Sequence, residues 1–203
     1  MTTRIAVVSA GLSQPSSTRL LADRLAAATA RELGGEAELD FIDLRDHARE
    51  LADNLLTGFP APSLRAAIDK VVTADGLIAV TPIFSASYSG LFKTFFDVLE
   101  PDSLAAMPVL AGATGGTERH SLALEHAVRP LFAYLRSIVV PTAVYAASTD
   151  WGANGADQAL NNRIDRAASE FSALLLGRTA TRPTDPYLDT TPFEDLLAAN
   201  LPH

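Results

Sequence analysis

Residues 5–25, IAVVSAGLSQPSSTRLLADRL, predict a β-strand, a turn rich in hydroxyl groups and the first half of an α-helix. The apolar residues 5–8 are typical of a buried strand, and apolar residues recur at helical spacing after the turn. Such a turn directs backbone N–H groups and hydroxyls toward the positive end of a helix dipole, which suits a phosphate dianion. Simple capping of the helix by Ser16 or Ser17 is the competing interpretation.

This turn lacks the signatures of the common nucleotide-binding loops. Its one glycine, Gly11, belongs neither to a Gly-Lys-Ser/Thr loop nor to a G-x-G-x-x-G fingerprint. Any phosphate would therefore be bound by hydroxyls and amides rather than by a lysine. The candidate phosphate-binding residues are Gly11, Ser13, Ser16, Ser17 and Thr18.

The composition limits the possible domain organisation, partners and chemistry of the protein. With 203 residues, 48% of them hydrophobic, the chain can form one α/β domain with a full core. Its formal net charge of −8 disfavours nucleic acid and anionic membrane surfaces as partners. The absence of cysteine excludes disulfides, thiolate metal sites and a cysteine nucleophile. The chain enters a strand by residue 5 and has no long apolar run, so we expect a cytoplasmic protein without a membrane span.

Strands and helices alternate along the whole chain. The predicted strands occupy residues 5–8, 36–44, 76–81, 107–113 and 138–147. The later predicted helices cover residues 48–56, a segment capped by Ser63, residues 91–99, residues 118–136 with a kink caused by Pro130, and residues 157–176 ended by Gly177. Five such repeats favour an α/β fold, a flavodoxin-like three-layer sandwich around a five-stranded parallel sheet of order 2-1-3-4-5.

In this strand order, the carboxyl ends of the first, third and fourth strands are neighbours. These ends lead into the three unusual loops of the chain, residues 9–18, 82–90 and 113–117. We therefore expect the three loops to form a single ligand site at one edge of the sheet.

The second and third loops suit a flat, mostly apolar ring system. Pro82 and Phe84 offer an apolar wall, and Gly115 and Gly116 allow positive φ and a close approach of the backbone to a ring edge. If a phosphate lies at the first loop, these two loops form a cradle for an isoalloxazine ring. Core packing of Phe84 and an ordinary Gly-Gly turn are the competing interpretations. The candidate ring-binding residues are Pro82, Ile83, Phe84, Ser85, Ser87, Thr114, Gly115 and Gly116.

Two segments, SAGLSQPSST at residues 9–18 and TPIFSASYSGLFKT at residues 81–94, resemble the NAD(P)H-dependent FMN reductase family. The similarity extends over roughly residues 4–150 in order and spacing. It implies that the three loops bind FMN, that NAD(P)H supplies the hydride, and that the protein forms homodimers or homotetramers. The most similar members supply reduced FMN to a separate flavin-dependent monooxygenase, which is thus an implied partner.

Some residues depart from the family pattern. Ser13 and Thr18 stand where an arginine and an asparagine are usual, and Phe84, Ser85 and Ser89 replace the usual tyrosine, asparagine and proline. Phosphate binding by neutral donors would be weaker, which suits a flavin that leaves as a product.

Hydride transfer from nicotinamide C4 to flavin N5 depends on the alignment of two rings rather than on an acid or a base, so we assign no catalytic side chain.

Arg119 could contact the flavin pyrimidine or a nicotinamide phosphate, or could simply be a surface cation. His120 and His126 are spaced six apart without a carboxylate pattern, so we expect no metal. Trp151 could cover the site or anchor a loop.

Several alternatives stay open at this level. A flavodoxin-like electron carrier would hold FMN tightly, a related reductase would pass electrons to quinones, azo dyes or chromate, and a non-redox protein could share the fold. We expect residues 1–177 to form the FMN-binding domain, and residues 178–203 to form a tail that either docks on a partner subunit or lies loose.

Overall fold

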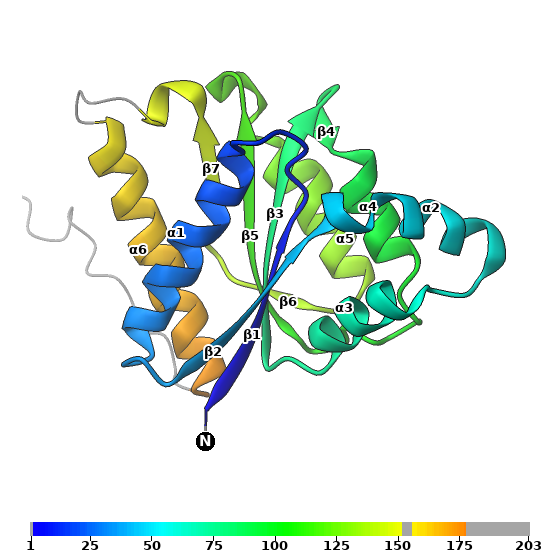
Figure 1. The fold of residues 1–203 in the computed structure, drawn as a ribbon. Helices are drawn as coiled ribbons and strands as arrows, with labels where there is room; N and C mark the ends of the chain where they lie inside the picture. The colour runs from blue at the N-terminus through cyan, green and yellow to red at the C-terminus, as the bar shows by residue number, and fades with distance from the viewer. Residues whose placement is uncertain (1, 152–155, 178–203) are drawn as a thin grey trace, which may run out of the picture.

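A parallel β-sheet lies at the centre of the protein, with helices against both of its faces (Figure 1). The computed structural model describes residues 2–151 and 156–177. In sheet order, the strands are β2 (Ala37–Asp43), β1 (Thr3–Ser9), β3 (Gly76–Phe84), β5 (Pro108–Gly115) and finally β6 (Ile138–Val139) with β7 (Val144–Ala147), both of which pair with β5. The predicted α/β fold and the order 2-1-3-4-5 are confirmed, with β6 and β7 sharing the fifth position.

The helices divide between the two faces of the sheet. One face is covered by α1 (Ser17–Glu32) and α6 (Ala156–Leu175), and the other by α2 (Ala48–Thr57), α3 (Pro62–Val72), α4 (Gly90–Asp97) and α5 (Arg129–Tyr134) (Figure 1). Consecutive strand residues face opposite sides, so that Val7 packs toward α1 and Val8 toward the second layer. This burial on both faces explains the continuous apolar runs of β1 and β3.

The fifth strand is interrupted, contrary to the continuous strand predicted over residues 138–147. β6 pairs with Pro108 and Val109, whereas β7 pairs with residues 112–115. Between them lies Pro141, which has no N–H group to donate to a neighbouring strand. β7 consequently has its own register against the end of β5.

A β-hairpin replaces the open loop predicted after the third strand. β3 continues to Phe84 and pairs with β4 (Ser87–Tyr88) in antiparallel fashion. The two turn residues, Ser85 and Ala86, have φ of 47° and 70°. Positive φ at both positions matches the strand twist in a two-residue turn, but glycine or asparagine usually supplies it. The sequence lacks that signal, so the prediction was wrong here.

The helix predicted over residues 118–136 is broken into short pieces. They are η2 (Glu118–His120), the π-helical η3 (Leu124–Val128) and α5. Pro130 accounts for the break near His126 because it cannot donate a helical hydrogen bond to that carbonyl. The predicted kink is thus confirmed in position, but its extent was underestimated.

Helix ends were predicted with mixed success. Ser63 does not cap α3, which begins at Pro62 after Ala61, and the Ser63 hydroxyl instead donates to Glu50. Proline at the first helical position makes a side-chain cap less important, since it has no N–H group to satisfy. Gly177, at φ 63°, follows the end of α6 as expected.

Two 3₁₀ turns, η1 (Leu44–His47) and η4 (Ser148–Trp151), complete the described elements. Within residues 2–151 and 156–177, none of the helices combines the length and apolar character that a membrane crossing requires. The predicted tail, residues 178–203, lies outside the described residues.

We predict that Ala86→Gly stabilises the protein by about 0.5–1 kcal/mol. Glycine removes the steric cost of positive φ at a residue with a Cβ, about 1–2 kcal/mol. Part of this gain is offset because glycine increases the conformational entropy of the unfolded chain. Urea unfolding measures this change. Ala66→Gly, at an exposed position within α3, is the matched control and should destabilise by about 1 kcal/mol. Destabilisation by both variants would contradict the strain assigned to the hairpin turn.

Candidate functional site

The turn between β1 and α1 is shaped by a serine cap and a glycine. Ser16 is the N-cap of α1, and its Oγ accepts a hydrogen bond from the N–H of Arg19 at 3.2 Å. A Cβ on Gly11 would lie 2.0 Å from that same Oγ, so only glycine allows the chain to pass. Of the two serines considered as caps in the competing interpretation, Ser16 is the one that caps α1, and Gly11 is required by close approach.

The hydroxyls of this turn differ in accessibility. Ser13 and Ser17 are exposed and Ser16 is half-buried, whereas Thr18 is only 3% exposed. The first N–H groups of an α-helix have no intrahelical partner, and Ser17 and Thr18 occupy these positions in α1. Exposed hydroxyls and unpaired amides thus gather at the positive end of the α1 dipole, an arrangement that can bind an anion.

The Thr18 side chain has a different role from the one predicted. Its Oγ1 lies 2.8 Å from Oγ1 of Thr114 at the end of β5, and both residues are only 3% exposed. This buried hydrogen bond connects the first loop directly to the third. Thr18 and Thr114 therefore hold the loops together, and Thr18 can offer a ligand its backbone N–H rather than its hydroxyl.

Arg19, in the first turn of α1, is paired with acidic residues. Arg19 forms ion pairs with Asp23, at 2.7 Å, and with Asp43, and its guanidinium stacks over Phe41 at 4.7 Å. The hydrogen bond to Asp23 raises the pKa of Arg19, so the group stays charged and paired. A cavity of about 370 Å³ beside the turn is lined by Arg19, Asp23 and Asp43, together with Asp46 and the exposed Arg45. An anion at Ser13 and Ser17 would therefore meet neutral donors and the Arg45 side of this cavity, whereas Arg19 is already paired with carboxylates.

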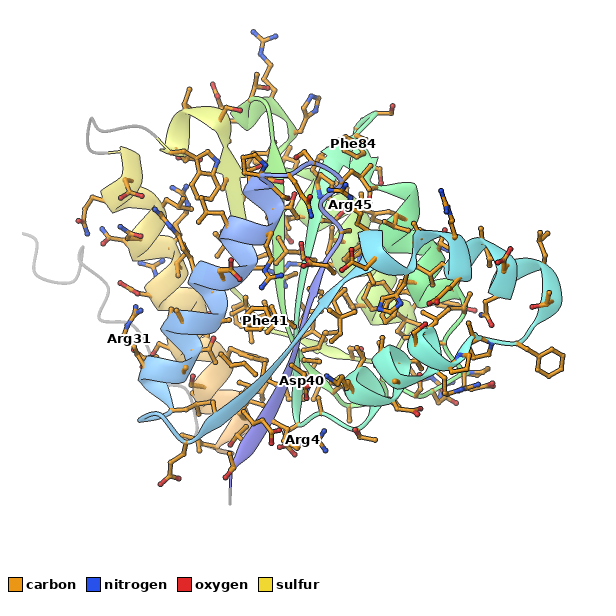
Figure 2. The ribbon with its side chains drawn as sticks, viewed as in Figure 1. Arg4, Arg31, Asp40, Phe41, Arg45 and Phe84 are labelled. Carbon is orange, nitrogen blue, oxygen red and sulfur yellow. The ribbon has the colours of Figure 1, made fainter. Side chains whose placement is uncertain are left out.

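The second loop presents one aromatic side chain at the surface. Pro82 and Ile83 are buried, whereas Phe84 is 48% exposed at the upper end of the sheet, as Figure 2 shows. Core packing of Phe84 is thereby excluded. Ser85 is exposed in the hairpin turn and Ser87 is half-buried on β4. Pro82 and Ile83 can contribute backbone groups to a ligand, and Phe84 a ring face.

Hydroxyl groups fix the base of this hairpin. Oγ1 of Thr81 accepts a hydrogen bond from the N–H of Ser89 at 3.1 Å, and Oγ of Ser89 caps α4 by accepting from Phe92 N–H at 3.2 Å. Thr81 and Ser89 are both buried. The hairpin is consequently held at a defined angle to the sheet.

The third loop corrects the predicted role of its glycines. Neither Gly115 nor Gly116 has positive φ. A Cβ on Gly115 would lie 2.0 Å from the hydroxyl of Tyr145, whereas Gly116 has open space around it. Gly115 therefore leaves room for the side chain of Tyr145, and the backbone at Gly116 is open to solvent.

The three loops meet at one edge of the sheet. Ser9 pairs with Val80, and Pro82 with Thr114, so the carboxyl ends of β1, β3 and β5 lie side by side at the upper end in Figure 1. The hydrogen bond between Thr18 and Thr114 joins the outer two loops across this edge. The structure thus brings the three predicted loops together at one edge of the sheet.

Comparison with known proteins identifies the family. The sequence model of the NADPH-dependent FMN reductase family matches residues 3–152. The chain belongs to this family. An FMN reductase (NADPH) of Pseudomonas aeruginosa is 37% identical over 87% of this chain and 94% of its own length. An NADH-dependent FMN reductase, SfnF, of Pseudomonas fluorescens is 36% identical over 86% of this chain and 92% of its own length.

Two solved structures share the fold. An oxidoreductase of Corynebacterium diphtheriae is 40% identical, with a TM-score of 0.83 over 88% of this chain and 99% of its own. The apo form of the NADH:FMN oxidoreductase EMOB is 29% identical, with a TM-score of 0.72 over 93% of this chain and 100% of its own. Relatives of this FMN reductase family member thus carry the names of both NADPH-dependent and NADH-dependent enzymes.

Other residues considered from the sequence lie as follows in this FMN reductase family member. Arg119, in η2, is exposed, as are His120 and His126. Across the described part of the chain, no group of three histidine and acidic residues could hold a metal ion. Trp151 is half-buried beneath the guanidinium of Arg24, 5.2 Å from its ring centre, which supports anchoring rather than covering of the site.

Sequence analysis missed Tyr145 and Arg19. Tyr145 crosses from β7 to the third loop, and Arg19 is held toward β2 by acidic residues. The i, i+4 spacing of Arg19 and Asp23 was the available signal for the second. No local pattern connects Tyr145 with Gly115, because the two residues are 30 positions apart in the sequence.

We predict that Thr18→Val and Thr114→Val each destabilise the protein by about 1–3 kcal/mol, because each leaves a buried hydroxyl without a partner. The double variant should cost much less than the sum of the two, since both polar groups are then gone. Urea unfolding of the four proteins measures this coupling. As a control, Thr29→Val removes another buried α1 hydroxyl that bonds only within the helix, and its effect should add to that of Thr114→Val. Additivity of Thr18→Val with Thr114→Val would refute the linkage.

Proposed function

We propose that the protein is an NAD(P)H-dependent FMN reductase that binds FMN across the three loops. Family membership over residues 3–152 supports the activity, and the anion-binding turn beside two ring-binding loops supports the placement. That turn is the observation on which the proposal rests, because the helix dipole and exposed hydroxyls match a terminal phosphate.

In this proposal, each loop has one task. Ser13, Ser16 and Ser17, with the free amides of α1, bind the FMN phosphate. The backbone of residues 82–85, the Phe84 ring and the exposed edge at Gly115 and Gly116 bind the isoalloxazine. Arg119, just beyond the third loop, is the cation nearest in sequence for a pyrimidine carbonyl or a nicotinamide phosphate.

The reaction asks the protein mainly to align two rings. Bound FMN supplies a ring that accepts a hydride from nicotinamide C4 at its N5. The hairpin, fixed by Thr81 and Ser89, and the third loop, fixed by Thr18, provide rigid walls for that alignment. No side chain is assigned to proton transfer.

The pairing of Arg19 with carboxylates supports FMN as an exchanging substrate. Charge-assisted hydrogen bonds from an arginine are stronger than those from hydroxyls, and Arg19 is paired with Asp23 and Asp43. We therefore propose that reduced FMN leaves and serves a separate flavin-dependent monooxygenase. Release of FMN on dilution, measured by the recovery of flavin fluorescence, tests this point.

We also propose a homodimer or homotetramer. A groove of about 930 Å³ between α4 and α5 is lined by apolar residues such as Phe96, Leu131 and Tyr134 and by charged residues such as Lys93, Asp97 and Arg136. Tyr134 is 85% exposed there, which favours a self-association surface. Light scattering after size-exclusion chromatography measures the subunit number.

Absorbance at 340 nm tests the activity. Oxidation of NADH or NADPH that depends on added FMN and saturates with it supports the reductase. A protein that stays yellow after gel filtration and oxidises neither nucleotide would instead be an electron carrier. Quinone, azo-dye and chromate acceptors added at saturating FMN test the alternative reductases.

We predict that Ser17→Ala weakens FMN binding about tenfold, or about 1.4 kcal/mol, while riboflavin binding stays unchanged, because riboflavin lacks the phosphate. Quenching of flavin fluorescence gives both dissociation constants. Ser63→Ala, an exposed serine in the first turn of α3, is the matched control and should change neither. Equal weakening of both flavins by Ser17→Ala would move the phosphate away from this turn.

A further inference from the structure

Tyr145 connects the outer strand of the sheet to the third loop. It lies on β7 opposite Ala113 of β5, is 8% exposed, and donates a hydrogen bond from its hydroxyl to the carbonyl oxygen of Thr117 at 2.7 Å. Thr117 lies two residues beyond the end of β5, where the chain no longer pairs in the sheet. The phenol therefore holds a segment that strand pairing does not hold.

The path of the phenol depends on Gly115. A Cβ at this position would lie 2.0 Å from Oη of Tyr145, 3.0 Å from Cζ and 3.7 Å from Cε2. The first of these distances is far below van der Waals contact, so Tyr145 reaches Thr117 only because Gly115 has no side chain. Both residues of this pair thus determine the shape of the third loop.

The hydrogen bond between Tyr145 and Thr117 has a fixed direction. The Thr117 carbonyl can only accept, so the phenol must be the donor. Burial raises the pKa of Tyr145, and the nearby charges of Asp150 and Glu118 raise it further. Asp150 is itself held by the N–H of Ala147 at 2.8 Å and by Arg163 at 3.3 Å. The hydroxyl consequently remains protonated and able to donate.

We propose that Tyr145 is a positioning residue for the flavin ring, acting through the backbone of residues 115–117 rather than by touching the flavin. This inference rests on the proposed function, which places the isoalloxazine against Gly115 and Gly116. A loop that is already held in its binding shape loses less conformational freedom when the ring binds. Tyr145 therefore raises the affinity for the ring and not for the phosphate.

Tyr145→Phe tests the inference because it removes only the hydroxyl. We expect FMN and riboflavin to bind about three- to tenfold more weakly, by the same factor, which is the range for loss of one neutral hydrogen bond. The KM for FMN should rise by a similar factor with kcat changed less than twofold. This pattern differs from that of Ser17→Ala, which should affect FMN alone. Thr73→Val, which removes one hydroxyl hydrogen bond to the Asp69 carbonyl at the exposed end of α3, is the control and should leave both affinities unchanged.

Gly115→Ala provides a second test that does not rely on the tyrosine variant alone. In the native background, the new methyl group meets the phenol oxygen, so flavin affinity should fall more than for Tyr145→Phe. In the Tyr145→Phe background that oxygen is absent and Cζ is the nearest ring atom, so the added loss from Gly115→Ala should be several-fold smaller.

The outcomes separate the two proposals. Flavin affinities of folded Tyr145→Phe within twofold of the native values, or equal losses from Gly115→Ala in both backgrounds, would overturn the positioning role while leaving the reductase intact. If Tyr145→Phe does not fold, as judged by circular dichroism, a Gly115→Ala protein that folds and binds both flavins as tightly as the native protein would overturn it too. Failure of the native protein to bind FMN would instead remove the proposed function.

Discussion

The hydrogen bond between the hydroxyls of Thr18 and Thr114 joins the two elements on which the site depends. It connects the first turn of α1 to the carboxyl end of β5 at the edge of the sheet. Because β1, β3 and β5 are adjacent and parallel, their following loops must emerge at one edge. The strand order brings the loops together, and this buried contact fixes the turn between β1 and α1 against the loop that follows β5.

An acidic protein can bind a phosphorylated ligand when the attraction is local. The net charge of −8 acts over distances at which salt screens it, whereas the α1 dipole and the free amides act at contact range. Arg19 does not supplement them, because Asp23, Asp43 and the Phe41 ring hold it beside β2. Under the proposed function, the pairing of Arg19 with carboxylates favours reversible binding of the flavin phosphate.

Close approach, rather than backbone torsion, explains two glycines of the site, Gly11 and Gly115. Gly11 leaves room for the capping serine, and Gly115 leaves room for the phenol of Tyr145. Positive φ occurs instead at Ser85 and Ala86, which carry side chains. The residue types in the loops therefore reverse the usual rule that glycine marks the left-handed positions, and this is why both the hairpin and the role of Gly115 escaped prediction.

The sequence by itself determined the alternation of strands and helices, the strand order, the Ser16 cap and the family, because these follow from local periodicity, short motifs and residue types near in the chain. Only the tertiary structure decided that the Thr18 hydroxyl bonds to Thr114, that Phe84 is exposed, and that Tyr145 passes over Gly115. Those features depend on which distant side chains the register of β5 with β7, and of β1 with β3, brings within a few ångströms. No local pattern carries that information, since a shift of one residue in register would turn each side chain to the opposite face.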